Sequence, residues 1–230
     1  MTGRVAIVAG GTGALGQSVV LRLLKDGASV EVPWVVPEEW DALQSRAADG
    51  RARLHGARGD VTDEGAVAAF VTDVLARHKR LDVLVNTVGG FAGGDLAATS
   101  LDEWRRILDL NLTSAVIGCR AVLPAMRGAR RGRIVNVSSR AVVPPAGGFI
   151  AYTVSKSAVI ALTQALALEE RPHGITVNAV LPNTMDTPAN RRAMPDADRS
   201  GWVSTDMVAG VIGYLASDAA AAVSGACIAV

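Results

Sequence analysis

The feature that most constrains the fold is an alternation, repeated along the whole chain, of short apolar runs and segments whose apolar residues have helical spacing. The run "RVAIVAG" (4–10) is typical of a buried strand, and "LGQSVVLRLLKDG" (15–27) has the pattern of a helix that ends at Gly27. Because parallel strands are joined by helical crossovers, this alternation predicts a parallel sheet with helices on both faces.

The predicted strands cover residues 4–10, 29–36, 53–61, 80–90, 132–139, 174–182 and 225–230, and the predicted helices cover 15–27, 37–50, 63–79, 101–127, 152–171 and 205–217. The pattern predicts one domain over residues 1–230, a doubly wound, seven-stranded parallel α/β sheet of the Rossmann type. Pro33 is unfavourable within its predicted strand because proline lacks the N–H group that a neighbouring strand would bind. The one long irregular stretch, 182–204, has a length typical of lids and binding loops.

Composition excludes several classes of partner. The chain has 23 basic and 22 acidic residues, a net charge of +1, so no field of one sign draws nucleic acid or an anionic membrane. Cys119 and Cys227 form no Cys-x-x-Cys pair, which argues against a disulfide framework or a zinc site. His55, His78 and His173 are scattered, and we expect no metal-ligand cluster. Without a leader or an apolar run of about 18 residues, we expect a soluble cytoplasmic protein.

A glycine-rich turn, "GGTGALG" (10–16), joins the first strand to the first helix. Glycine allows a sharp turn and lets backbone N–H groups approach a pyrophosphate, and the helix behind it adds partial positive charge. Its place at the first strand-to-helix junction gives the pattern its meaning. The turn therefore predicts a dinucleotide site, and a tight turn without a ligand is the alternative.

The end of the second predicted strand bears on which dinucleotide binds. A carboxylate about 20 residues beyond the turn would bind the ribose of NAD, whereas NADP requires positive charge for its 2′-phosphate. Trp34 occupies the expected place, and no basic residue lies in the turn or just after the strand. We assign the nearby Glu38 and Glu39 to the start of the next helix. We expect NAD(H) or NADP(H), with NADH favoured.

Tyr152 and Lys156 are four residues apart in "AYTVSKS" (151–157), within a predicted helix. Residues at this spacing share a helix face, so the lysine can lie beside the phenol. A nearby ammonium favours the phenolate, and we expect a tyrosine pKa lowered towards neutrality, which suits a general acid or base. Ser139 ends a predicted strand 13 residues earlier, where ligands collect in open sheets, and Asn111 lies inside the long predicted helix.

These motifs resemble the short-chain dehydrogenases/reductases nearly from end to end. The glycine turn matches the family's cofactor motif, with Ala14 where a second glycine is usual. Asp60 and Val61 match the pair that holds the adenine, "NTVGG" (86–90) stands where the family has Asn-Asn-Ala-Gly, and "LPNTMDT" (181–187) matches the segment after the sixth strand. The family's four catalytic residues are matched in order and spacing by Asn111, Ser139, Tyr152 and Lys156.

The resemblance implies an NAD(P)-dependent oxidoreductase that reduces a small-molecule carbonyl or oxidises the alcohol. Tyr152 would exchange the proton, and Lys156 would lower its pKa and bind the nicotinamide ribose. Ser139 would hydrogen-bond the substrate oxygen, and Asn111 would anchor a water linked to the lysine. The implied cofactor-binding residues are Gly10, Thr12, Gly13, Ala14, Leu15, Gly16, Trp34, Asp60, Val61, Asn86, Gly89, Tyr152, Lys156, Pro182, Thr184 and Thr187.

Other functions stay open. The stretches "GGTGALG", "VGGFAGG" and "LPNTMDTPANRRAMPDADRSGW" resemble dihydropteridine reductase, which makes NADH-dependent pterin reduction an alternative. Ser139 and Trp34 oppose it, because that enzyme resembles relatives without the serine and carries aspartate at the end of the second strand. A non-catalytic dinucleotide-binding regulator is a second alternative, although such relatives usually lose the tyrosine or the lysine. The apolar faces of the two long helices imply a homodimer or homotetramer, despite a missing Asp-Gly-Gly ending.

Overall fold

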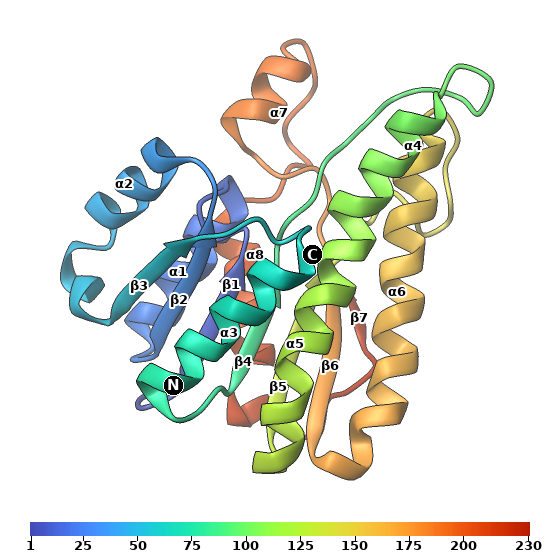
Figure 1. Cartoon of the computed structure of the whole chain (residues 1–230). Coiled ribbons are helices and arrows are strands. Elements are labelled where there is room, and N and C mark those ends of the chain that lie inside the picture. Colours follow the sequence, from blue (N-terminus) through green and yellow to red (C-terminus); the bar gives the residue numbers. More distant parts are fainter.

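In the computed structural model, which describes residues 1–230, seven parallel strands form one sheet in the order β3-β2-β1-β4-β5-β6-β7 (Figure 1). The strands are β1 Val5–Ala9, β2 Ser29–Trp34, β3 Leu54–Arg58, β4 Val83–Asn86, β5 Gly132–Val137, β6 Ile175–Leu181 and β7 Cys227–Ala229. The predicted doubly wound α/β fold is confirmed. The strand order reverses between β1 and β4, and ligands of open α/β sheets bind at the carboxyl ends of strands at such a reversal.

Helices cover both faces of the sheet and bury one apolar core on each. One core joins the sheet to α1 (Ala14–Lys25), α2 (Pro37–Arg46) and α8 (Thr205–Leu215). The other joins it to α3 (Glu64–His78), α5 (Ser114–Ala129) and α6 (Ile150–Glu170), which lie in front of the strands in Figure 1. Successive strand residues point to opposite faces, so β1 sends Ala6 and Val8 into the first core and Val5 and Ile7 into the second.

The long helix predicted over 101–127 is interrupted by a wider turn. It consists of α4 (Leu101–Leu108), a π-helical segment (Asp109–Thr113) and α5. Ser100 starts it by accepting a hydrogen bond from the backbone of Glu103. π-helical turns inside α-helices are often found at functional sites, and this one carries Asn111.

Two helical stretches, Leu101–Ala129 and Ile150–His173, are long and apolar enough to cross a membrane. The prediction that no segment reaches this length is therefore wrong. Both stretches pack on the sheet, and they bury the polar side chains of Asn111 and Lys156. These are properties of core helices in a globular domain.

Pro33 fits within β2 for a simple reason. The ladder between β1 and β2 ends at the pair Ile7–Glu31, and beyond it β2 pairs with β3 alone. A missing N–H at Pro33 therefore breaks no bond of the β1 ladder. The strand continues to Trp34, so its carboxyl end lies where the sequence predicted.

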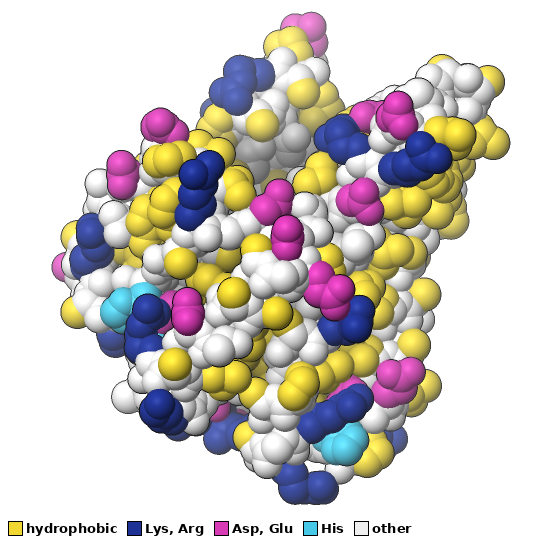
Figure 2. All heavy atoms as spheres, viewed as in Figure 1, with side chains coloured by type: hydrophobic (Ala, Val, Ile, Leu, Met, Phe, Trp, Pro, Cys, Tyr) yellow, Lys and Arg dark blue, Asp and Glu magenta, His cyan; other side chains and the backbone are white.

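The stretch 182–204, predicted to be irregular, contains a short helix, α7 (Pro188–Ala193). Its two ends are joined by backbone hydrogen bonds, from Val203 to the carbonyl of Thr184 and from Asp186 to the carbonyl of Val203. The segment projects above the carboxyl ends of the strands, opposite the ends of α4 and α6 (Figure 1). Figure 2 shows a hollow between these two projections.

Candidate active site

The glycine turn lies between β1 and α1, beside the first residues after β4. Gly10 has a φ of +76°, and a Cβ there would lie 2.8 Å from Thr87 Oγ1. A Cβ on Gly16 would lie 1.9 Å from the carbonyl oxygen of Gly10. Both positions therefore require glycine, one for its backbone conformation and both for the close approach of neighbouring chain.

The amino end of α1 is open to a ligand. Its N-cap residue is Gly13, no side chain caps the helix, and its first turn holds no acidic residue. By contrast, Asp63 caps α3 and Ser204 caps α8. Uncapped N–H groups and the helix dipole together fit an anion, and the turn thus fits the pyrophosphate of a dinucleotide.

A carboxylate reaches this turn from α2. Thr12 Oγ1 donates to Glu39 Oε2 at 2.9 Å, and the Thr12 carbonyl accepts from Gln17 Nε2 at 2.8 Å. Glu39 lies in the first turn of α2, as predicted, but its side chain also faces the glycine turn. Trp34, at the end of β2, stacks on Trp40 of α2 with the ring centroids 6.2 Å apart and the planes 8° from parallel.

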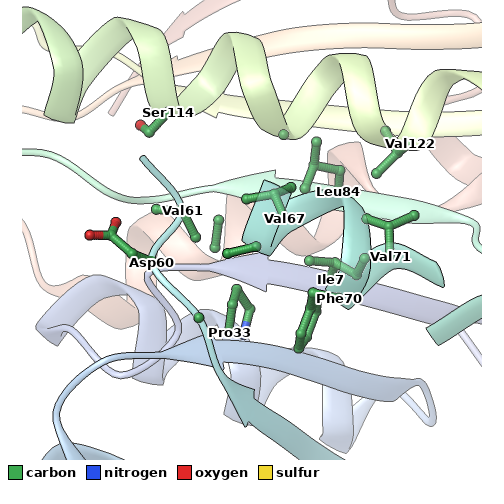
Figure 3. Close-up of a pocket in the computed structure, with 14 residues that line it drawn as sticks. Ile7, Pro33, Asp60, Val61, Val67, Phe70, Val71, Leu84, Ser114 and Val122 are labelled. Atoms are coloured by element: carbon green, nitrogen blue, oxygen red, sulfur yellow. The ribbon is translucent and has the colours of Figure 1, made fainter. Parts of the chain in front are cut away.

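An apolar cavity opens beside Asp60 and Val61, between the sheet and helices α3 and α5 (Figure 3). Asp60 lies at one end, where its carboxylate accepts from the backbone N–H and the hydroxyl of Thr62. Pro33 and Phe70 line the walls. The cavity is small, with an accessible volume of about 20 Å³, which is close to the room that one water molecule needs.

Tyr152 and Lys156 both lie in the first two turns of α6, at the predicted spacing. Lys156 is 5% exposed, and its Nζ donates to the carbonyl oxygen of Val137, the last residue of β5, at 2.9 Å. Burial lowers the pKa of Lys156 from 10.5 to about 8. The ammonium is thus held next to the sheet edge in a site that favours its neutral form.

The expectation of a lowered tyrosine pKa is wrong for the protein without ligand. Burial raises the pKa of Tyr152, and a hydrogen bond with Ser139 opposes that rise only in part. Lys156 exerts no resolved pull on the phenol, because its ammonium points to the Val137 carbonyl instead. Sharing a helix face therefore does not by itself activate the tyrosine here.

Asn111 is 2% exposed and faces the site rather than water. Its Oδ1 accepts from the Gly90 N–H at 2.8 Å, and its Nδ2 donates to the Gly90 carbonyl at 3.0 Å and to Ser155 Oγ at 2.9 Å. Ser155 in turn donates to the carbonyl of Tyr152. The π-helical turn thus ties the segment after β4 to the start of α6.

Gly89 lies between two of the predicted catalytic side chains. A Cβ at this position would lie 2.8 Å from Asn111 Oδ1 and 3.0 Å from Lys156 Nζ. The segment after β4 therefore lies at the same edge of the sheet as Asn111 and Lys156. Ser139, just after β5, and Tyr152 lie at this edge too. Asn86, also a predicted cofactor residue, uses its amide inside the protein, where it donates to Asn136 on β5.

Ser139 and the segment after β6 complete the edge. Ser139 is 8% exposed, and its Oγ accepts from the N–H of Ala141. The carbonyl of Pro182 accepts from the N–H of Arg140, which joins the two segments. Thr187 is buried and caps α7 through the N–H of Asn190, so its hydroxyl already has one partner.

Several residues of this region were missed by the sequence analysis. Ser155 could have been noticed, since it lies between Tyr152 and Lys156 on the same helix. Ser138, whose hydroxyl donates to the Lys156 carbonyl, ends β5 beside Ser139. Phe91 carried no sequence signal, because its contact with Tyr152 joins segments far apart in the chain, whereas Phe149 directly precedes α6 and could have been noticed.

The expectation of scattered histidines is wrong. His55 and His78 lie together with Glu31, and their potential ligand atoms are all within 4.8 Å of one another. Glu31 is 1% exposed, and its carboxylate takes hydrogen bonds from Arg77 and a short contact with His78 Nε2. The buried Glu31 of β2 is thereby joined to Arg77 and His78 of α3.

The uncapped glycine turn at the sheet reversal, with the half-buried Tyr152 and the buried Lys156 at the same edge, fits a dinucleotide-dependent oxidoreductase. A family model described as short chain dehydrogenase matches residues 4–198. The chain belongs to this family of NAD(P)-dependent enzymes. A 3-alpha-(or 20-beta)-hydroxysteroid dehydrogenase of Mycobacterium tuberculosis is 35% identical over 98% of this chain and 87% of the relative. A cyclopentanol dehydrogenase of Comamonas testosteroni is 35% identical over 86% and 78%.

Solved structures agree with this assignment. NAD⁺-bound xylitol dehydrogenase superposes with a TM-score of 0.91 at 26% identity, covering 100% of this chain and 98% of that one. An actinorhodin polyketide ketoreductase with NADPH gives a TM-score of 0.91 at 30% identity, covering 99% and 95%. The first of these neighbours holds NAD⁺ and the second NADPH, so structures of this fold accept both nicotinamide dinucleotides.

Proposed function

We propose that the protein reduces a carbonyl compound, or oxidises the corresponding alcohol, with Tyr152 as the general acid or base. The observation that carries this proposal is the convergence of four polar side chains at the carboxyl edge of the sheet. Asn111 and Lys156 flank Gly89, and Ser139 lies near enough to the Tyr152 phenol to lower its pKa. A bound nicotinamide would supply the hydride, and the protein would supply orientation and the proton.

The chain's own residues divide the proton chemistry. Tyr152, whose pKa is raised in the free protein, is protonated at neutral pH and is ready to donate its proton to a carbonyl oxygen. Ser139 lies within hydrogen-bonding reach of the phenol and can donate to the same oxygen as negative charge develops there. Lys156, with a pKa of about 8, is poised to return a proton to the site near neutral pH.

Asn111 acts as the positioning residue in this scheme. Its hydrogen bonds to Gly90 and Ser155 tie the segment after β4 to the first turns of α6, which carry Tyr152 and Lys156. We propose that a water bound at Asn111 links Lys156 to solvent. Thr187 and the N-terminal end of α7 would contact the nicotinamide side, and Trp34, Asp60 and Val61 the adenosine side.

We further propose that NADH is the preferred cofactor. The Glu39 carboxylate, bonded to Thr12, places negative charge at the glycine turn. A carboxylate there can accept from a ribose hydroxyl, and it repels a 2′-phosphate. Glu39 would thus take over the role of the aspartate that Trp34 replaces at the end of β2.

The decisive variant is Tyr152→Phe, because it removes one oxygen and leaves the ring. We expect turnover to fall by about 10²- to 10⁴-fold while the affinity for NADH stays within about 2-fold. Tyr214→Phe is the matched control, since Tyr214 is the only other tyrosine and lies on α8. Turnover of Tyr152→Phe equal to that of the control would remove Tyr152 from the mechanism.

We propose in addition a cytoplasmic homodimer or homotetramer. Leu101, Val154 and Leu168 on the long helices are 69%, 39% and 73% exposed, and a second subunit would cover such apolar side chains. Light scattering coupled to size exclusion measures the assembled mass. A monomer at micromolar concentration would contradict this part of the proposal.

A further inference from the structure

The phenol of Tyr152 lies in a cluster of aromatic rings. The chain has only three phenylalanines and two tyrosines, yet two of the former and one of the latter touch one another here. The ring centroids are 5.1 Å apart for Phe91 and Tyr152, 6.1 Å for Phe149 and Tyr152, and 5.7 Å for Phe91 and Phe149. We call these two phenylalanines the aromatic wall.

The wall is built by two loops that the backbone fixes to each other. Phe91 lies just after β4 and Phe149 just before α6. Gly94 N–H donates to the carbonyl of Gly148, and Ile150 N–H donates to the carbonyl of Gly94. The two loops are therefore held together beside the reacting hydroxyl before a ligand arrives, which lowers the cost of ordering them on binding.

Exposure shows that the wall does not serve the core. Phe91 is 62% exposed, although burying a phenylalanine would stabilise the fold. Leu96 and Val143, on the same two loops, are 69% and 42% exposed. Exposed apolar side chains grouped next to a reactive group are the usual lining of a ligand site.

The charges near the wall are few, and most are already paired. Arg106 is bonded to Glu103 through two hydrogen bonds, and Arg191 on α7 is bonded to Asp186 in the same way. Arg140 is the one cation on the loops that carry the wall. Apart from Arg140 and the exposed Arg192 of α7, this surface offers little charge to hold a phosphate or a carboxylate.

We infer that the substrate is an apolar, ring-bearing ketone or its secondary alcohol, whose hydrocarbon body packs on Phe91 and Phe149 while its oxygen meets Tyr152 and Ser139. The inference rests on the proposed function and names the substrate class of that same site. Rings of the substrate can stack offset or edge-on against the two phenyl groups. Acyclic polyols and acidic keto compounds would lose this contact without gaining a polar one.

The test compares three probe ketones with NADH: 2-decalone, acetone and dihydroxyacetone. We expect the highest kcat/KM for 2-decalone. Phe91→Ala and Phe149→Ala should each lower that kcat/KM by about 10-fold or more, mainly through KM, because the lost contact is made before the chemical step. The ratio of 2-decalone to acetone activity should fall with it. Tyr214→Ala, which truncates a 46% exposed aromatic side chain on α8, should leave the ratio unchanged.

Binding measured without turnover separates the two proposals. Calorimetry of 2-decalone with the NADH-loaded Tyr152→Phe protein should show binding that Phe91→Ala weakens by about 10-fold. If both phenylalanine variants keep the wild-type ratio of 2-decalone to acetone activity, or if the protein prefers dihydroxyacetone, the aromatic wall does not bind the substrate. The proposed reductase activity would still hold. If no probe is turned over but 2-decalone binding still depends on Phe91, the proposed reductase activity is wrong and the apolar binding site is supported. Phe149→Leu replaces Phe149→Ala if the latter fails to fold.

Discussion

The buried Lys156 should cost the protein stability, and this cost can be measured. Its pKa is about 8 in the folded chain and ordinarily 10.5. The difference of about 2.5, at 1.36 kcal/mol for each unit of pKa, corresponds to about 3 kcal/mol of penalty at pH 7. Replacing the lysine by methionine removes this penalty and also the hydrogen bond to the Val137 carbonyl, which is worth about 1 kcal/mol. Lys156→Met should therefore be about 2 kcal/mol more stable than the wild type at pH 7, and inactive.

The pH dependence identifies the cause. Between pH 8 and pH 10.5 the unfolded chain binds a proton at this lysine that the folded chain does not, so wild-type stability rises with pH in this window. The cost of burying the charged lysine lowers the free energy of unfolding in full below pH 8, and it disappears above pH 10.5. The advantage of Lys156→Met should thus shrink by about 2 kcal/mol, to near zero, between pH 7 and pH 10.

The assay is urea unfolding of the cofactor-free protein, followed by circular dichroism at the two pH values. Lys25→Met is the matched control, because Lys25 is exposed at the end of α1 and should show no pH-dependent difference from the wild type. A Lys156→Met protein that is no more stable than the wild type at pH 7, with the same gap at pH 10, would refute the reasoning.

Three further predictions follow from the contacts of the site. Gly16→Ala should abolish tight NADH binding in a fluorescence titration, because its Cβ would meet the Gly10 carbonyl at 1.9 Å, whereas Gly128→Ala has open space and should bind normally. Glu39→Gln should lower the KM for NADPH relative to that for NADH by about 10-fold, since it removes a charge that opposes the 2′-phosphate. If the ratio of the two KM values is the same in Glu39→Gln and in the adjacent Glu38→Gln, the Glu39 carboxylate has no role in cofactor choice. Ser155→Ala should reduce the free energy of unfolding by about 1–2 kcal/mol in urea and lower kcat more than it changes the KM for NADH, because the buried amide it bonds loses a partner.

The fold was predictable because its signal is periodic and local. Runs of β-branched and apolar residues alternate with helical spacing, and each strand lies within its predicted range. The place of the glycine turn and the shared helix face of Tyr152 and Lys156 follow from the same regularity. Boundaries failed where tertiary contacts decide them, as in the long loop where Thr187 caps the short helix α7.

The environment of the site was not predictable, because it depends on which distant segments meet. A π-helical turn directs Asn111 inward, and periodicity does not mark such a turn. The depth of burial sets the pKa of Tyr152, and it outweighs the nearby lysine that the sequence suggested as the dominant influence. The contact of Glu39 with Thr12 joins residues 27 apart in sequence, and neither side chain signals the other.

The most direct test of the account is a crystal structure of the protein with NADH and 2-decalone bound. The account predicts the pyrophosphate at the glycine turn and the carbonyl oxygen of the ketone within about 2.6–3.2 Å of the Tyr152 hydroxyl. It also predicts the nicotinamide C4 about 3–3.5 Å from the carbonyl carbon. A nicotinamide ring bound away from the edge that carries Ser139 and Tyr152, or a phenol directed away from the ketone, would contradict it.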